Sequence, residues 1–310
     1  MTTASQCAHW IVESPTCETS MDVKLLTHTG LLLHLLILLG SYVNGQILGN
    51  HGNDHFHADM RIELVHDSHD DESPSHMHHN MHPSLIVFFF VEDLKLGNTI
   101  PVYFPRKEPS SSPNLLPKEE ADSIPFGSQE LPNLLQFFSF PQDSSQATAM
   151  QNTLRACEAH PIKGETKICA TSLESMLDFV QTIFGLETKL KVISTTHYTE
   201  TKTPIQQKYT VKGIREVSAP KFVACHTIVY PYAVFYCHHQ TSKSRVFVVS
   251  LTGENGDKVE ALAVCHLDTT QWSKNHVSFK VLGIKPGSSP VCHFFPADNF
   301  VWVPSDDSMV

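Results

Sequence analysis

The sequence is poor in basic residues and in charge of either sign. Its 310 residues contain 22 lysines and arginines against 32 aspartates and glutamates, which gives a formal net charge of -10, and charged residues make up only 17% of the chain. A nucleic-acid-binding protein needs a basic face, so this balance argues against a nucleic-acid partner. The sequence also contains no Asn-x-Ser/Thr sequon, so N-glycosylation is not expected.

Several motifs that carry chemistry are missing as well. The chain has no Gly-x-Ser-x-Gly, no phosphate-binding glycine loop and no His-Glu-x-x-His, so none of the reactions that depend on these motifs is predicted. No apolar run reaches the roughly 20 residues that a membrane-spanning helix needs, so the mature chain is predicted not to enter a membrane. A hydrophobic content of 41% is nevertheless enough to build a core.

The longest apolar run, Leu31–Leu39, has the length of the hydrophobic part of a signal peptide. Lys24 supplies the positive charge that precedes such a run, and the small residues before Gly45 offer a cleavage site. We therefore predict a signal peptide at residues 21–45, and residues 1–20 are interpreted as an upstream extension or a mis-called start. The alternative is a buried core helix. Entry into the secretory pathway would allow cysteines to form disulfides.

Histidine is unusually frequent, and nine of the 20 histidines lie between residues 46 and 83. This segment has almost no aromatic side chain and too little apolar surface to fold by itself, so we predict a flexible leader. One hypothesis is loose metal capture, or a tether whose charge changes near pH 6. The alternative is a low-complexity spacer without a ligand.

The segment after the leader is expected to contain both strands and helices. Leu85–Val91 is typical of a buried strand, and Pro101–Pro105 is a second extended piece. Residues 106–123 are rich in proline and serine and are predicted to form a loop. Residues 131–140 and 146–157 have helical character.

A better-defined helix is predicted after residue 171. Thr171 and Glu174 have the spacing of a capping box, in which the hydroxyl and the carboxylate satisfy free backbone N–H groups. Apolar residues then recur mostly every three or four positions from Leu173 to Phe184. Gly185 is a natural end for this helix.

The remainder of the chain is predicted to be mostly β. Segments rich in Val, Tyr and Phe are found at 222–236, 245–251, 259–266, 277–282 and 291–295. Gly253–Asp257 has the composition of a hairpin turn between two of them. Strands and helices do not alternate, so the sequence predicts an α+β fold. In it, a helical N-terminal part packs on a mostly antiparallel β C-terminal half that is stapled by disulfides.

The most specific pattern is a set of four Cys-His dipeptides with the spacing CH-x10-CH-x26-CH-x25-CH. The dipeptides are Cys225-His226, Cys237-His238, Cys265-His266 and Cys292-His293. Neighbouring side chains of a strand point to opposite faces, so the cysteines are expected on one side and the histidines on the other. Oxidation of the cysteines would leave the four histidines free to converge on a metal.

Three interpretations of this pattern remain open. An all-imidazole site suits Cu(II) or Zn(II), and copper is favoured where it is present. A zinc site with mixed cysteine and histidine ligands is the second, and the absence of any stable metal is the third. His276 is a further candidate ligand, although a single histidine is more often structural.

The six cysteines that follow the predicted signal peptide are all candidates for disulfides. They are Cys157, Cys169, Cys225, Cys237, Cys265 and Cys292, and six cysteines allow fifteen pairing patterns. A local Cys157–Cys169 bond is the simplest expectation, because it would close a short loop before the capped helix. The pairing of the other four stays open.

The dipeptide array resembles the signature of the plant BURP-domain family. Further segments fit that family, among them Phe89-Phe90 with Glu92-Asp93-Leu94-Lys95, Lys163 to Met176, Tyr230 to His238, and Asp268-Thr269 with Trp272. The resemblance covers residues 84–304, leaves a tail at 305–310, and is nearest in type to the unknown-seed-protein and microspore members.

The resemblance implies a secreted product that is extracellular, wall-associated or vacuolar. It also implies a role in seed or reproductive development, the cell wall or stress response, with cell-wall polysaccharide or a peptide as partner. Some members of the family are copper-dependent peptide cyclases, and their copper ligands correspond to His226, His238, His266 and His293. Tyr and Trp, which those enzymes crosslink, are absent from residues 46–83. A non-enzymatic protein is therefore expected first, and a cyclase that acts on another peptide second.

Overall fold

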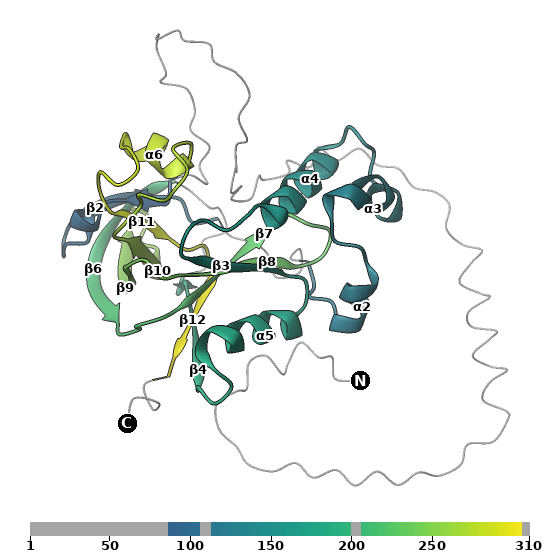
Figure 1. The fold of residues 1–310 in the computed structure, drawn as a ribbon. Coiled ribbons are helices and arrows are strands. Elements are labelled where there is room, and N and C mark those ends of the chain that lie inside the picture. The colour runs from purple at the N-terminus through teal and green to yellow at the C-terminus, as the bar shows by residue number, and fades with distance from the viewer. Residues whose placement is uncertain (1–85, 106–112, 200–205, 306–310) are drawn as a thin grey trace, which may run out of the picture. The chain divides into compact units, whose positions relative to one another are not determined.

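The computed structural model describes residues 86–105, 113–199 and 206–305. The predicted upstream extension, signal peptide and histidine-rich leader lie outside the described residues, as does the tail beyond Ser305. The described residues form two β-sheets with helices beside them (Figure 1). Within these ranges, the helices are too short or too polar to cross a membrane.

The larger sheet has the strand order β1-β11-β10-β9-β6-β2, and β5 pairs with β10. Its strands are β1 (Phe88–Phe89), β2 (Thr99–Val102), β5 (Thr196–His197), β6 (Gln207–Val217), β9 (Ser244–Gly253), β10 (Lys258–His266) and β11 (Val291–Phe294). The predicted turn between β9 and β10 is confirmed, and Gly256 adopts a φ of +86° within it, a conformation that glycine reaches without strain.

The smaller sheet has the strand order β3-β8-β7-β12-β4. Its strands are β3 (Glu165–Ala170), β4 (Leu190–Ser194), β7 (Val223–Ile228), β8 (Val234–Gln240) and β12 (Phe300–Pro304). Every pairing between the named strands of the described ranges is antiparallel. The prediction of an α+β fold with mostly antiparallel strands is therefore confirmed.

The helices are found both before and within the β region. They are α2 (Lys118–Ser123), α3 (Leu131–Phe137), α4 (Ser145–Glu158), α5 (Leu173–Phe184) and α6 (Val277–Leu282), with short 3-10 turns at η3 (Val91–Asp93) and η5 (Ser128–Glu130). The predicted helices corresponding to α3, α4 and α5 are confirmed. Part of the predicted loop at 106–123 is instead the helix α2.

Two strand predictions were wrong in detail. Residues 222–236 form two strands, β7 and β8, because the chain turns at residues 229–233 between them. The run at 85–91 gives only the short strand β1 before η3 begins.

The segment 277–282 is a helix, α6, although its valines and phenylalanine favour a strand. His276 caps its first turn, because the ring Nδ1 accepts a hydrogen bond from the Ser278 N–H. Gly283 ends it in the left-handed conformation. Local capping at both ends therefore outweighs the weak β preference of these side chains.

The cap of α5 lies one residue later than predicted. Ser172, not Thr171, accepts from the backbone of Ser175, and the Ser175 hydroxyl accepts from the N–H of Ser172. Gly185 ends the helix as expected, with a φ of +90°.

The two sheets enclose a shared core and each has a second apolar face. Side chains from β6, β9 and β10 meet those from β7 and β12 in the intersheet core, a cluster that includes Ala224, Leu262, Val264 and Phe295. The outer face of the smaller sheet is covered by α5 (Figure 1), through Met176 and other apolar residues. The other face of the larger sheet holds a separate cluster around Phe294.

The described part of the chain contains three disulfides, and they differ in how far they are buried. Cys157 at the end of α4 is bonded to Cys169 in β3, as predicted, and both are partly exposed. The other four cysteines have an exposed fraction of 0%.

We expect a mild reductant to open the Cys157–Cys169 bond before the other two, because thiol–disulfide exchange requires access to a sulfur atom. Brief treatment of the folded protein with a low concentration of dithiothreitol, followed by alkylation and peptide mass mapping, should label these two cysteines first. Earlier labelling of a cysteine in β7, β8, β10 or β11 would contradict this prediction.

Candidate metal centre

The four Cys-His dipeptides lie on two pairs of neighbouring strands. Within the smaller sheet, Cys225 of β7 is directly opposite Cys237 of β8. Within the larger sheet, Cys265 of β10 is directly opposite Cys292 of β11. Each sheet therefore contributes one pair of dipeptides.

The opposed cysteines form cross-strand disulfides. The Cα atoms are 4.0 Å apart in the Cys225–Cys237 bond and 3.9 Å apart in the Cys265–Cys292 bond. These bonds use all four array cysteines, so no thiolate remains to bind a metal. The mixed cysteine–histidine zinc site is therefore wrong for this chain.

Alternation along the strands separates the sulfurs from the imidazoles. Cys225 and Cys237 belong to the cluster beneath α5, whereas Cys265 and Cys292 belong to the cluster around Phe294. The histidines point the other way. The predicted opposition of cysteine and histidine is thus found in each sheet, but the cysteines occupy two separate outer clusters and not one common side.

The four histidine rings meet at the edge of the intersheet core. The ring centroids of His226 and His238 are 5.5 Å apart within the smaller sheet, and those of His266 and His293 are 5.6 Å apart within the larger one. His226 and His293, from different sheets, are 6.0 Å apart. Phe295 packs against both of these rings, at 4.8 and 4.9 Å. We call these four histidines the histidine array.

Burial keeps three rings of the array in the neutral form. His226 and His266 are 7% and 5% exposed, and burial, reinforced by the neighbouring histidines, lowers the pKa of each well below its ordinary value. Burial likewise lowers the pKa of His293 to about 3. A neutral imidazole has a free lone pair, which is the form that binds a metal.

Polar side chains contact the array from outside. Nδ1 of His238 lies 3.1 Å from a carboxylate oxygen of Glu165, which is partly buried on β3. Burial opposes ionisation of Glu165, but its contacts with His238, the Ile162 N–H and Lys167 outweigh that effect and lower its pKa. A carboxylate behind a histidine is a common arrangement in metal sites, where it orients the ring.

The other contacts come from neutral groups. Nδ1 of His266 lies 3.3 Å from the Ser244 hydroxyl, and Nδ1 of His226 lies 3.4 Å from the Asn299 amide nitrogen. Neither Glu165 nor Asn299 was identified from the sequence, because nothing in their spacing links them to the dipeptides.

The donors suit a metal, but the rings are not yet close enough to share one. A tetrahedral site with metal–nitrogen bonds of ordinary length places imidazole centroids about 5 Å apart, slightly less than the spacings found here. In the described ranges, no three His, Cys, Asp or Glu side chains form a ready-made metal site. Four imidazoles without thiolate fit Cu(II) or Zn(II) chemically, and the rings would have to tighten around the ion.

His276 has a structural role in addition to any role in binding. Its Nδ1 contacts the Ser278 hydroxyl at 2.7 Å and caps α6, while its ring packs 4.5 Å from that of Trp272. Burial lowers its pKa to about 4. Trp272 also lies 4.9 Å from His266, so its ring contacts both His276 and one histidine of the array.

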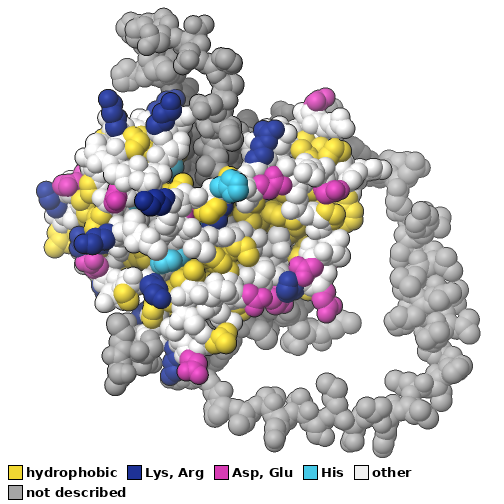
Figure 2. Space-filling model, viewed as in Figure 1, with side chains coloured by type: hydrophobic (Ala, Val, Ile, Leu, Met, Phe, Trp, Pro, Cys, Tyr) yellow, Lys and Arg dark blue, Asp and Glu magenta, His cyan; other side chains and the backbone are white. Residues whose placement is uncertain are grey.

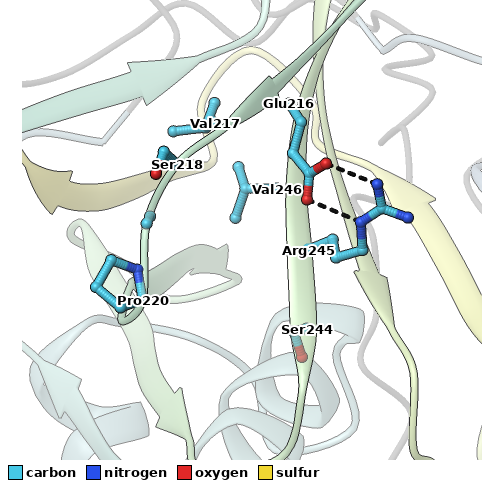
Figure 3. Close-up of a pocket in the computed structure, with 8 residues that line it drawn as sticks. Glu216, Val217, Ser218, Pro220, Ser244, Arg245 and Val246 are labelled. Carbon is cyan, nitrogen blue, oxygen red and sulfur yellow. Dashed lines mark hydrogen bonds and ion pairs between the residues drawn. The ribbon is translucent and has the colours of Figure 1, made fainter.

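A surface hollow lies next to the array. It has a volume of about 460 Å³ and is bounded by the end of β6, residues 218–220 and the start of β9 (Figure 3). Arg245 donates two hydrogen bonds to Glu216, of 2.8 and 2.6 Å, at its rim. Ser244 lines the hollow and also contacts His266, so the hollow adjoins the array.

On the face in Figure 2 both signs of charge are interspersed, and histidine is visible only at isolated places.

Comparison with known proteins gives consistent matches. The BURP domain matches residues 87–304. BURP domain-containing protein BNM2A of Brassica napus is 44% identical over 226 residues, which cover 71% of this chain and 80% of that protein.

Two Arabidopsis thaliana proteins give similar matches. BURP domain protein USPL1 is also 44% identical, with 71% of this chain and 81% of that protein covered. BURP domain protein RD22 is 40% identical, with 71% and 56% covered. The matched region contains all four Cys-His dipeptides, and the chain belongs to the BURP domain family.

Proposed function

We propose that this protein is secreted and holds copper in its histidine array without catalysing a reaction. The observation that carries the proposal is the meeting of four imidazoles from four strands that are crosslinked in pairs behind them. Membership of the family supports the proposal of a role in seed or reproductive development, the cell wall or stress response. A cell-wall polysaccharide is the partner that this role suggests.

The surroundings of the array support metal holding. Each disulfide lies one residue before the histidines of its strand pair, so it fixes the spacing of those strands. The low exposure of His226 and His266 keeps water away from the rings. The nearby carboxylate of Glu165 supplies negative charge that would offset part of the charge of a bound cation.

A copper-dependent peptide cyclase that acts on a separate peptide is the second candidate. Bound copper would supply the capacity for one-electron oxidation of an aromatic side chain. The hollow beside His266 favours this candidate, because it offers a place for part of a peptide next to the array. Serine, proline and the Glu216–Arg245 pair at its edge could contact a peptide backbone.

Replacing all four array histidines with asparagine is expected to remove the tightest copper site of the full-length protein. Copper retained against a competing chelator, measured by elemental analysis, should fall in this variant. The matched control is His160→Asn, which removes an exposed histidine elsewhere. The histidines of residues 46–83 are present in all variants, so copper bound there does not contribute to the difference between the variants. Equal retention by the wild type and the fourfold variant would contradict metal holding.

The same preparation distinguishes the two candidates. The copper-loaded protein is mixed in air with a peptide that contains tyrosine and tryptophan, and the peptide is analysed by mass spectrometry. No change in peptide mass supports the non-enzymatic proposal. Loss of two hydrogen atoms per peptide, absent with the fourfold variant, would establish the cyclase instead.

A further inference from the structure

The array histidines are not equivalent in the groups that face them. A carboxylate faces Nδ1 of His238, and a hydroxyl faces Nδ1 of His266. Both groups can accept a hydrogen bond from an N–H. The group that faces Nδ1 of His226 is the amide nitrogen of Asn299, which can only donate.

The orientation of the Asn299 amide is set by its other contacts. Its Oδ1 is 2.9 Å from the backbone nitrogen of Thr227 and 3.1 Å from the Thr227 hydroxyl. A backbone N–H has no acceptor capacity, so the oxygen of the amide must lie on that side. The NH₂ group therefore faces His226. Asn299 is 1% exposed, so water does not compete for these contacts.

From these contacts we infer that Asn299 is a positioning residue that holds His226 in the tautomer with its proton on Nε2. A neutral imidazole has one N–H and one lone pair, and the lone pair of His226 is used at Nδ1. The ring then presents an N–H, not a lone pair, at its other nitrogen. The carboxylate 3.1 Å from Nδ1 of His238 can only accept, and the Ser244 hydroxyl near Nδ1 of His266 can accept while it donates to the Ser242 carbonyl oxygen, 3.5 Å away. Both contacts are compatible with the opposite tautomer, in which Nε2 carries the free lone pair.

The consequence of this tautomer for metal binding rests on the proposed function and makes that function more specific. The array would supply three imidazole ligands, from His238, His266 and His293, while His226 remains a hydrogen-bond donor. A metal with three protein ligands keeps a coordination position open for another molecule.

The tautomer can be tested without any metal. Long-range 1H–15N correlation NMR of the metal-free, full-length protein distinguishes a protonated Nδ1 from a protonated Nε2, and His226→Gln identifies the signals of His226. We expect protonation at Nε2 in the wild type and at Nδ1 in Asn299→Asp, whose side chain can only accept. Asp298→Asn is the matched control, because it changes the adjacent charge and leaves the Asn299 amide in place.

Protonation at Nδ1 in the wild type, or an unchanged tautomer in folded Asn299→Asp, would overturn the inference. If circular dichroism shows that Asn299→Asp does not fold, the inference is tested by the tautomer of the wild type and by the copper affinity of His226→Asn. We expect His226→Asn to bind Cu(II) nearly as well as the wild type. The Cu(II) affinity of His238→Asn should fall by more than the roughly 10–100-fold that is typical when a ligand loses the group that hydrogen-bonds to it from behind.

Copper measurements complete the test. With substoichiometric Cu(II), electron paramagnetic resonance should show three coordinating nitrogens in the wild type and a fourth in Asn299→Asp, with about 10-fold tighter binding. Equal losses for His226→Asn and His238→Asn would overturn the assignment of three ligands. If no variant differs from the fourfold variant, the metal proposal fails, while the NMR result on the tautomer stands by itself.

Discussion

Replacing Cys265 and Cys292 together with alanine is expected to lower the free energy of unfolding by about 4 kcal/mol. The bond joins residues separated by 27 positions, and chain entropy alone assigns about 3.5 kcal/mol to a loop of that size. Both cysteines are fully buried among apolar side chains, so the lost sulfur contacts add to the cost. Denaturant unfolding under non-oxidising, thiol-free conditions, followed by circular dichroism, would measure the change.

The matched control is the double replacement of Cys157 and Cys169. This bond spans 12 positions and is partly exposed, so we expect a smaller loss, of about 3 kcal/mol or less. The control should also leave copper binding intact, because neither cysteine adjoins the histidine array. A loss as large as that of the Cys265 and Cys292 variant would contradict the role assigned to burial and loop length.

Phe294→Ala is expected to destabilise the protein by about 3–5 kcal/mol. Phe294 is fully buried in β11, one residue after His293. Its ring stacks on that of Phe89 in β1 with a centroid distance of 4.4 Å, and it lies 5.8 Å from that of Phe104. Alanine would leave a cavity where β1 and β11 pack together. The midpoint of denaturant unfolding should fall accordingly.

Two further variants separate cavity formation from a general effect of losing phenylalanine. Phe137→Ala removes a ring that is 66% exposed, and it should change stability by no more than about 0.5 kcal/mol. Phe294→Leu leaves a smaller cavity and should lie between the wild type and Phe294→Ala. Similar losses for Phe137→Ala and Phe294→Ala would show that the cluster around Phe294 does not carry the stability assigned to it.

Local sequence signals were sufficient where the controlling contacts are local. The α4 and α5 helices, the turn after Gly253 and the Cys157–Cys169 bond all depend on residues close together in the chain, and each was predicted. The alternation of cysteine and histidine was also predictable, because strand geometry forces adjacent side chains to opposite faces.

Predictions failed where the structure of a segment depends on a helix cap, or where a contact depends on a residue far away in the chain. Residues 277–282 have strand-like composition, yet the ring of His276 and the left-handed Gly283 stabilise a helix there. Asn299 was missed because its contact with His226 spans 73 positions and depends on the pairing of β12 with β7. Glu165 reaches His238 in the same way, through the pairing of β3 with β8.

The sequence by itself determined the family, the β-rich character, the paired positions of cysteine and histidine, and the net negative charge. Only the tertiary structure decided how the four cysteines of the Cys-His dipeptides pair and which histidines meet. Strand register selects the disulfide pairing, because Cys225 faces Cys237 and Cys265 faces Cys292. The packing of the two sheets selects the histidines that meet, since it brings His226 to His293 across the intersheet core. Neither depends on spacing along the chain, because register and sheet packing are fixed by contacts between distant strands.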